Sequence, residues 1–248
     1  MRDPYGRIET MKNMTIAITA AAIASTASAG VVDMQFTGTG AGSQVQLTMG
    51  ADVRDTFAGE INHTIANASG ADAYLNGSVT TFCPDITESV TSDFEEYTVT
   101  DVENVPLLGG GGSPMSSDRA DAIRALYSFS ANTLIAGGLS NAFATAFQLV
   151  IWEVVEDFDG TAASINVDAG NTIFKNTDGD ALDGDILAAI ASITSDMMDA
   201  LANGGANSNN VVGLANAGYQ DQLVAVPAPG AMALLSIGGL VASRRRRS

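Results

Sequence analysis

The chain has 248 residues with a formal net charge of −17, and 46% of its residues are apolar. This length and apolar content suffice for one sizeable core, but the large excess of acidic residues would repel a phosphate backbone, so nucleic-acid binding is excluded. A single histidine and a single cysteine exclude a multi-histidine metal site, an internal disulfide and a two-cysteine redox pair.

Residues 1–29 are predicted to be an N-terminal extension followed by a secretory signal peptide. The apolar run 15–24 follows a short basic start, and an Ala-Ser-Ala cleavage site stands at 27–29. The position of the start codon is left open between three methionines: Met1, Met11 and Met14. The mature chain is therefore expected to begin near Gly30 and to be exported.

Residues 30–223 are predicted to form one body. Its first part consists of short runs of alternating apolar and polar residues, which are typical of antiparallel strands separated by glycine-rich turns. The expected strand segments are 31–37, 44–49, 61–65, 73–75, 79–83 and 97–102. A glycine run at 109–112 ends this part of the chain.

Helices are expected next, beginning near Asp118, Ser140 and Asp185. The second helix, which continues to Val155, is apolar on almost all sides and should be buried. The third should end at Gly204, and a final strand is expected at 221–226. These elements predict an α+β fold, in which a β-sandwich or barrel of short antiparallel strands carries a helical insertion.

Residues 224–248 combine a short motif, an apolar segment and a basic end. The motif consists of Val226, Pro227, Pro229 and Gly230, and the basic end consists of Arg244, Arg245, Arg246 and Arg247. This arrangement resembles the PEP-CTERM sorting signal. The resemblance implies transit across the inner membrane, transient anchoring there, processing by an exosortase-like membrane protease and a final location at the cell surface or in the extracellular matrix. An ordinary C-terminal membrane anchor is the alternative.

Two residues of the body call for a chemical explanation. Cys83 is the only cysteine of a chain that is predicted to be secreted, where a free thiol invites oxidation. Gln148 lies inside an otherwise apolar helical segment, and burying an amide without partners is costly. An internal thioester between these two side chains would explain both. An inert buried cysteine and a glutamine that bonds the backbone are the alternative.

The sequence also resembles the thioester domains of bacterial surface adhesins. That family pairs an aromatic-Cys motif on a strand with a later Q-x-x-I-W motif on a helix. Phe82 and Cys83 match the first motif, and Gln148, Ile151 and Trp152 match the second. Pro84 departs from the pattern, because a less constrained apolar residue usually follows the cysteine. The resemblance implies a Cys83–Gln148 thioester that reacts with an amine on a target.

A weak calcium motif lies between the second and third expected helices. Asp178, Asp180 and Asp183 place carboxylates at intervals, as calcium loops do, but the segment does not fit the EF-hand pattern. A turn before a helix explains these acids equally well. Apart from this candidate calcium site, no cofactor is expected.

Three functional hypotheses follow from the sequence. The first is a secreted adhesion or matrix protein, not an enzyme, that attaches to a surface polymer or another amine-bearing target through the thioester. The second is a purely structural biofilm-matrix protein of the same fold with Cys83 as a free thiol. The third, a secreted hydrolase, is disfavoured because no histidine-based or paired-acid site is evident.

Overall fold

A computed structural model describes residues 30–106 and 114–227 of the chain. The strands are β1 (Val31–Met49), β2 (Asp52–Ala66), β3 (Gly77–Phe82), β4 (Glu95–Thr100), β5 (Thr172–Lys175), β6 (Val211–Ala215) and β7 (Gln222–Ala225). The α-helices are α1 (Ser117–Ala136), α2 (Asn141–Glu156) and α3 (Gly184–Ala202). Short 3-10 turns occur at Gly70–Leu75, Val102–Asn104, Ala162–Ser164 and Gly205–Asn207.

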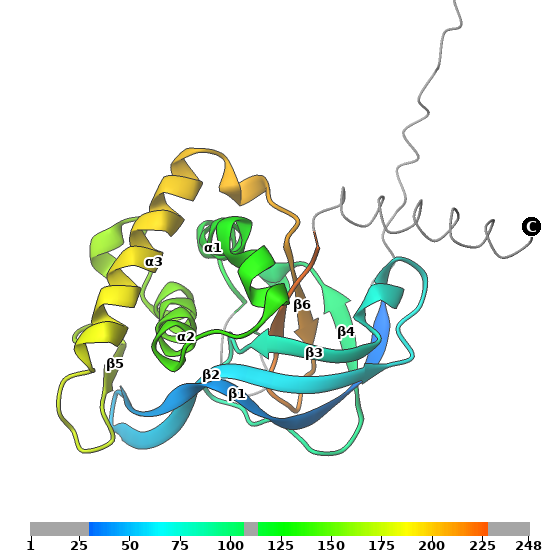
Figure 1. Cartoon of the computed structure of the whole chain (residues 1–248), viewed down its shortest axis with the longest axis horizontal. Helices are drawn as coiled ribbons and strands as arrows, with labels where there is room; N and C mark the ends of the chain where they lie inside the picture. The colour runs from blue at the N-terminus through cyan, green and yellow to red at the C-terminus, as the bar shows by residue number, and fades with distance from the viewer. Residues whose placement is uncertain (1–29, 107–113, 228–248) are drawn as a thin grey trace, which may run out of the picture.

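The seven strands form one antiparallel sheet that closes on itself. Its order is β2-β3-β7-β6-β4-β1-β5, and β2 pairs again with β1, so six strands form a ring to which β5 is added. All three α-helices lie between β4 and β6 in the chain. Figure 1 shows them gathered over one half of the long β1–β2 hairpin, while β3, β4 and β6 stand at the other half. The predicted α+β class with an antiparallel, sandwich- or barrel-like sheet is therefore confirmed.

Strand β1 bends, and it therefore pairs with different strands in the two halves of the molecule. Its first residues pair with β4, whereas Gln46–Met49 pair with β5 under the helices. Register shifts against β2 occur between Phe36 and Gly38 and between Thr39 and Gly42. Gly42 has a φ of 155°, and a Cβ there would lie 2.5 Å from the carbonyl oxygen of Ala58. Only glycine fits such a bend.

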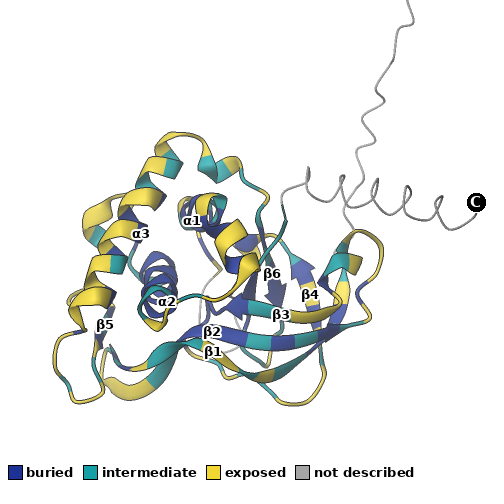
Figure 2. Ribbon diagram, viewed as in Figure 1, coloured by how far each residue is buried: buried dark blue, intermediate teal, exposed yellow. Residues whose placement is uncertain are grey.

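Two apolar cores stabilise these halves. Paired residues such as Met34 and Ile65, or Val99 and Leu214, bury the same face of the ring and fill its interior. A larger core lies between the ring and the helices and includes almost every side chain of α2. Figure 2 shows α2 as the most deeply buried helix, whereas α3 exposes its outer face. Each large side chain buried in this way contributes roughly 1.5–3 kcal/mol.

Several predicted boundaries differ from the observed ones. Segments 31–37 and 44–49 belong to one strand, and 73–75 was expected to be a strand but lies in the 3-10 turn Gly70–Leu75. Strands β5 and β6, of four and five residues, were not predicted. The third helix ends at Ala202, two residues before Gly204, whose positive φ of 86° follows the helix end.

The two terminal signals lie largely outside the described residues. This applies to the predicted signal peptide at 1–29 and to Pro229, Gly230 and the four C-terminal arginines. Strand β7 continues to Ala225, and the backbone N–H of Val226 donates to the carbonyl of Asn210 at 2.8 Å. Between residues 30 and 227, leaving out 107–113, no helix has the length and apolar character that a membrane span needs.

Candidate functional site

The end of β3 positions Cys83. Thr81 and Phe82 are held on one side by β7, where they pair with Val224 and Leu223. Thr81 also pairs with Ile61 of β2 on the other side. Cys83 follows directly and is completely buried. Because β2 and β7 fix the end of β3 from both sides, the backbone of Cys83 is held in one position next to the helices.

Helix α2 brings Gln148 to the same place. Its N-cap is Ser140, whose hydroxyl accepts a hydrogen bond of 3.2 Å from the backbone N–H of Phe143. One turn before Gln148, the hydroxyl of Thr145 donates to the carbonyl of Ala58 on β2 at 3.3 Å. The small residues at this turn let the helix rest closely on the sheet, as the sequence indicated.

Cys83 and Gln148 lie in direct contact, although 65 positions separate them in sequence. The backbone N–H of Cys83 donates to Oε1 of Gln148 at 3.0 Å, and Nε2 of Gln148 donates to the backbone carbonyl of Cys83 at 2.7 Å. The amide is 1% exposed, so both bonds form away from solvent. This two-way pairing fixes the orientation of the Gln148 carboxamide over the cysteine.

The Cys83 thiol is held in its neutral form. Its Sγ donates to the carbonyl oxygen of Asp85 at 2.6 Å. Burial is the main cause that raises the pKa of the thiol well above its usual value, and the negative charges of Asp85 and Asp221 raise it further. The Asp85 backbone and the nearby Trp152 side chain act in the opposite direction and lower it.

Aromatic side chains enclose the pair. The ring of Phe82 packs edge-on against Phe147 with centroids 4.8 Å apart, and Tyr127 contacts Phe147 in the same manner at 5.5 Å. Trp152 stacks on Phe174 of β5, while Ile151 is fully buried in the same core. Phe82, Ile151 and Trp152, the motif residues named from the sequence, therefore all belong to the apolar core that contains these rings.

A chain of buried and partly buried polar side chains, which sequence reasoning missed, approaches the site from the sheet. The Thr81 hydroxyl donates to Gln222 at 2.7 Å, Gln222 donates to the side chain of Gln220 at 3.1 Å, and Gln220 donates to the Asp85 carbonyl at 3.1 Å. The same hydroxyl lies 3.1 Å from Nδ1 of His63. Gln220 just before the final strand and Gln222 at its start were the available signal.

His63 is the only histidine of the chain and ends this network. It is 2% exposed, and burial lowers its pKa from 6.5 to about 4, against a weaker opposing effect of a backbone hydrogen bond at Ile61. The ring is therefore neutral at ordinary pH. Its Nδ1 is paired with the Thr81 hydroxyl.

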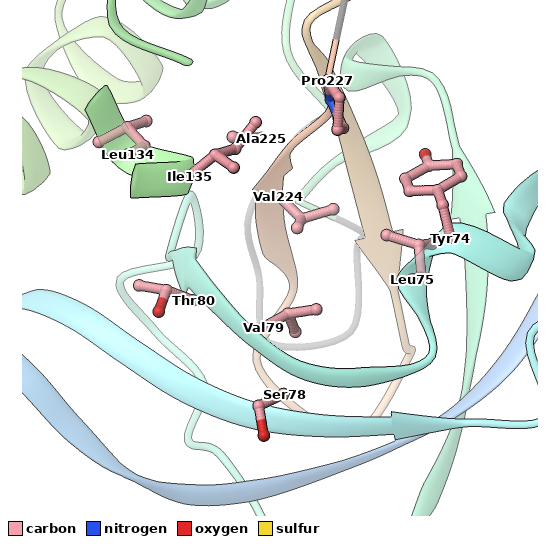
Figure 3. A pocket seen from close by; sticks show the side chains of 10 residues that line it. All are labelled: Tyr74, Leu75, Ser78, Val79, Thr80, Leu134, Ile135, Val224, Ala225 and Pro227. Carbon is pink, nitrogen blue, oxygen red and sulfur yellow. The ribbon is translucent and has the colours of Figure 1, made fainter. Parts of the chain in front are cut away.

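An apolar hollow in the ring lies elsewhere. Figure 3 shows this cavity, of about 350 Å³, where the start of β3 and the end of β7 separate beneath the end of α1. It is lined by Tyr74, Leu75, Ser78, Val79, Thr80, Leu134, Ile135, Val224, Ala225 and Pro227. Neither Cys83 nor Gln148 lines it, and its only polar side-chain atoms are hydroxyl oxygens. Pro227, part of the predicted sorting motif, lies at its edge.

The candidate calcium loop folds as a turn before α3. The backbone N–H of Gly179 donates to the carbonyl of Asn176 at 2.8 Å, and that of Asp180 donates to the carboxylate of Asp178 at 3.0 Å. The side chain of Asn176 donates to Asp183 at 3.1 Å. In the part of the chain that the structure describes, no three or more His, Cys, Asp or Glu residues form a group that could hold a metal.

Because carboxylate oxygens of Asp178 and Asp183 already accept hydrogen bonds within the turn, calcium is expected to act on this protein only through its ionic strength. The formal charge of −17 produces self-repulsion that any cation screens, so moderate salt should raise the melting temperature. Calcium and sodium chloride at equal ionic strength should raise it equally in a thermal melt. A calcium-specific increase that disappears in an Asp178→Asn variant would contradict the turn interpretation.

Comparisons with known proteins add nothing to this geometry. No protein-family model matches the chain, and neither does any curated protein or solved structure. The function must therefore be argued from the arrangement of Cys83 and Gln148 themselves.

Proposed function

We propose that the chain is a secreted or cell-surface adhesion protein that attaches covalently to an amine-bearing target through an internal Cys83–Gln148 thioester. The observation that carries the proposal is the two-way hydrogen bonding of the Gln148 carboxamide to the backbone of Cys83. It holds the electrophilic carbon of Gln148 beside the residue that bears the only thiol of the chain.

The hydrogen bonds favour attack of sulfur on the amide. When Sγ of Cys83 bonds to the side-chain carbonyl carbon of Gln148, negative charge develops on Oε1. The backbone N–H of Cys83 already donates to that oxygen at 3.0 Å. This N–H can therefore stabilise the developing negative charge, as the donors of an oxyanion hole do. The C–N bond of the amide then breaks, the thiol proton goes to the nitrogen, and ammonia leaves. Fixed proximity replaces an external catalyst in this step.

Burial supports persistence of the product. Both side chains are almost completely excluded from solvent, within the wall formed by Phe82, Phe147 and Trp152. Water would reach such a thioester slowly. A target amine that reaches it would form a new C–N bond at the Gln148 acyl carbon, break the C–S bond and return Cys83 to a thiol. The protein would then be joined to its target by an amide bond.

The two terminal signals supply the cellular context of the proposal. The signal-peptide pattern and the resemblance to a PEP-CTERM tail support export, a transient hold in the inner membrane and processing by an exosortase-like protease. The strongly acidic composition suits a hydrated protein outside the cell, where neutral polymers and amine-bearing surfaces are accessible.

A second function, a structural matrix protein without covalent chemistry, is favoured by one observation. The raised pKa of Cys83 and the hydrogen bond of its Sγ to the Asp85 carbonyl describe a stable neutral thiol. In that case Gln148 is simply a buried amide with both hydrogen-bonding groups satisfied. A hydrolase gains no support, because the only histidine is buried against Thr81.

Intact mass spectrometry separates the two functions. The purified mature protein is expected to weigh one ammonia less than its own sequence, and methylamine should then add its full mass, which leaves the protein one CH2 group heavier than that sequence. Cys83→Ala and Gln148→Ala should show neither effect, because each removes one partner of the bond. Gln44→Ala, which changes an exposed glutamine on β1, is the matched control and should behave like the wild type. A mass equal to that of the unmodified sequence, together with a titratable thiol, would contradict the thioester and favour the structural matrix protein.

A further inference from the structure

Trp152 buries a hydrogen-bond donor without a conventional partner. Its Nε1 is one of three buried side-chain polar atoms, among the described residues, that make no hydrogen bond, and the residue is 2% exposed. Leaving a buried donor unpaired costs about 1–3 kcal/mol. Packing alone does not account for it, because a phenylalanine would fill an apolar wall without that penalty.

The position of Trp152 on α2 directs it toward the cysteine. Trp152 lies four residues after Gln148, so both side chains occupy the same face of the helix. The Gln148 amide bonds the Cys83 backbone in both directions, and the Trp152 side chain is close enough to Cys83 to influence its thiol. Stacking on Phe174, with centroids 5.7 Å apart and rings inclined by 15°, fixes the plane of the indole.

We propose that the indole N–H of Trp152 stabilises negative charge on the sulfur of Cys83, and so makes this sulfur both a better nucleophile and a better leaving group. This role of Trp152 rests on the proposed thioester function, because stabilising a charged sulfur is useful to the protein only if the thioester forms and reacts. A neutral thiol is a weak acceptor, whereas a thiolate is a strong one. The donor therefore has no adequate partner in the resting protein and gains one when the sulfur becomes charged.

The surrounding charges explain why such a donor is needed. Three titratable groups interact with Cys83: Asp85 after β3, Asp221 before β7 and Tyr97 on β4. Burial raises the pKa of Cys83 most, and the two carboxylates raise it further because they disfavour a thiolate. The Trp152 side chain lowers this pKa. Trp152 is the side chain that opposes them.

The same contact acts in the reaction with a target. When an amine attacks the Gln148 acyl carbon, the C–S bond breaks and its electron pair stays on sulfur. The N–H of Trp152 then donates to that sulfur until the proton released by the amine neutralises it. No other reactant is required.

The test measures the thiol itself, so that it does not depend on thioester formation. In a Gln148→Ala background, the pH dependence of iodoacetamide alkylation reports Cys83, which is the only cysteine. Adding Trp152→Phe should raise the apparent pKa of the thiol and slow alkylation at a fixed pH about tenfold or more, as loss of a hydrogen bond to a charged group predicts. Tyr127→Phe, which removes another unpartnered buried donor from the same wall, should change neither value.

A second variant covers the case in which Trp152→Phe does not fold. Trp152 is the only tryptophan, so biosynthetic replacement with an analogue carrying sulfur in place of the indole N–H alters this position alone and keeps the ring size. An unchanged thiol pKa in either folded protein would overturn the proposal. The mass of the protein with Gln148 intact shows separately whether the thioester forms. The Trp152 proposal can therefore fail while the thioester function is supported, and the reverse is also possible.

Discussion

Replacing Arg119 with alanine is expected to lower the free energy of unfolding by about 3 kcal/mol, because three hydrogen bonds from a charged group are lost at once. Arg119 lies in the first turn of α1, and its guanidinium donates to the carbonyls at the end of α2. Nε donates to Phe158 at 3.3 Å, one terminal nitrogen donates to Glu156 at 3.0 Å, and the other donates to Val155. A cation at this helix end also interacts favourably with the helix dipole.

Two variants separate geometry from charge in this prediction. Arg119→Lys keeps the charge but not the planar fork that reaches three carbonyls, so an intermediate loss is expected. Arg124→Ala is the matched control on the same helix. Within the described ranges 30–106 and 114–227, Arg124 forms ion pairs only with the solvent-accessible acids Asp121 and Glu103, so this substitution should cost less than about 1 kcal/mol. Urea unfolding measures all three; equal losses for the two alanine variants would refute the capping role.

The Arg119 contact also connects the fold to the site. Helix α2 carries Gln148 and Trp152, and its start is fixed by the Ser140 cap while its end is fixed by Arg119. Loss of one fixed end should let the helix shift relative to β3. A folded Arg119→Ala protein is therefore expected to form the proposed thioester more slowly than the wild type, even though Arg119 does not touch Cys83.

The elements that sequence reasoning located were those with long, regular patterns. Helix α2 was placed within one residue of its observed start, because Ser140 is a good N-cap and the apolar run after it is continuous. Strands β5 and β6 were missed, although β7, which is equally short, was predicted, so a run of four or five residues is an unreliable signal. The ring closure between β1 and β2 depends on bends at Gly38 and Gly42, which local patterns do not reveal.

The site was predictable only where single residues looked out of place. Cys83 and Gln148 stood out because each is unusual in its local sequence, and these two residues lie together. Asp85, Gln220 and Gln222 were not noticed, since polar residues near strand ends are common and only the folded chain shows them to be buried or bonded to one another. The unpaired N–H of Trp152 is likewise a property of packing, not of sequence.

Glu153 is expected to make stability fall as pH rises. It is fully buried on α2, where its carboxylate accepts the backbone N–H of Asn166 at 2.9 Å and the hydroxyl of Thr172 at 3.3 Å. Burial, more than the nearby charge of Asp157, raises its pKa from 4.5 to about 7. The folded state thus holds a proton that the unfolded state releases first, so the stabilisation is complete below pH 4.5 and is lost as pH rises toward 7.

The Glu153→Gln variant, compared with the wild type, isolates this effect. The difference in unfolding free energy between the two proteins should change by about 3 kcal/mol across that pH interval, in favour of the wild type at low pH. His63 acts in the opposite direction in both proteins, because its pKa is lowered from 6.5 to about 4 and its stabilisation is lost on acidification. The contribution of His63 therefore cancels in the comparison.

Glu88→Gln is the control. Burial also raises the pKa of Glu88 to about 7, but this side chain is only partly buried. Screening by solvent should therefore make the effect of Glu88→Gln on the unfolding free energy clearly smaller. Parallel stability curves for wild type and Glu153→Gln, measured by urea unfolding at each pH, would show that Glu153 ionises normally inside the core.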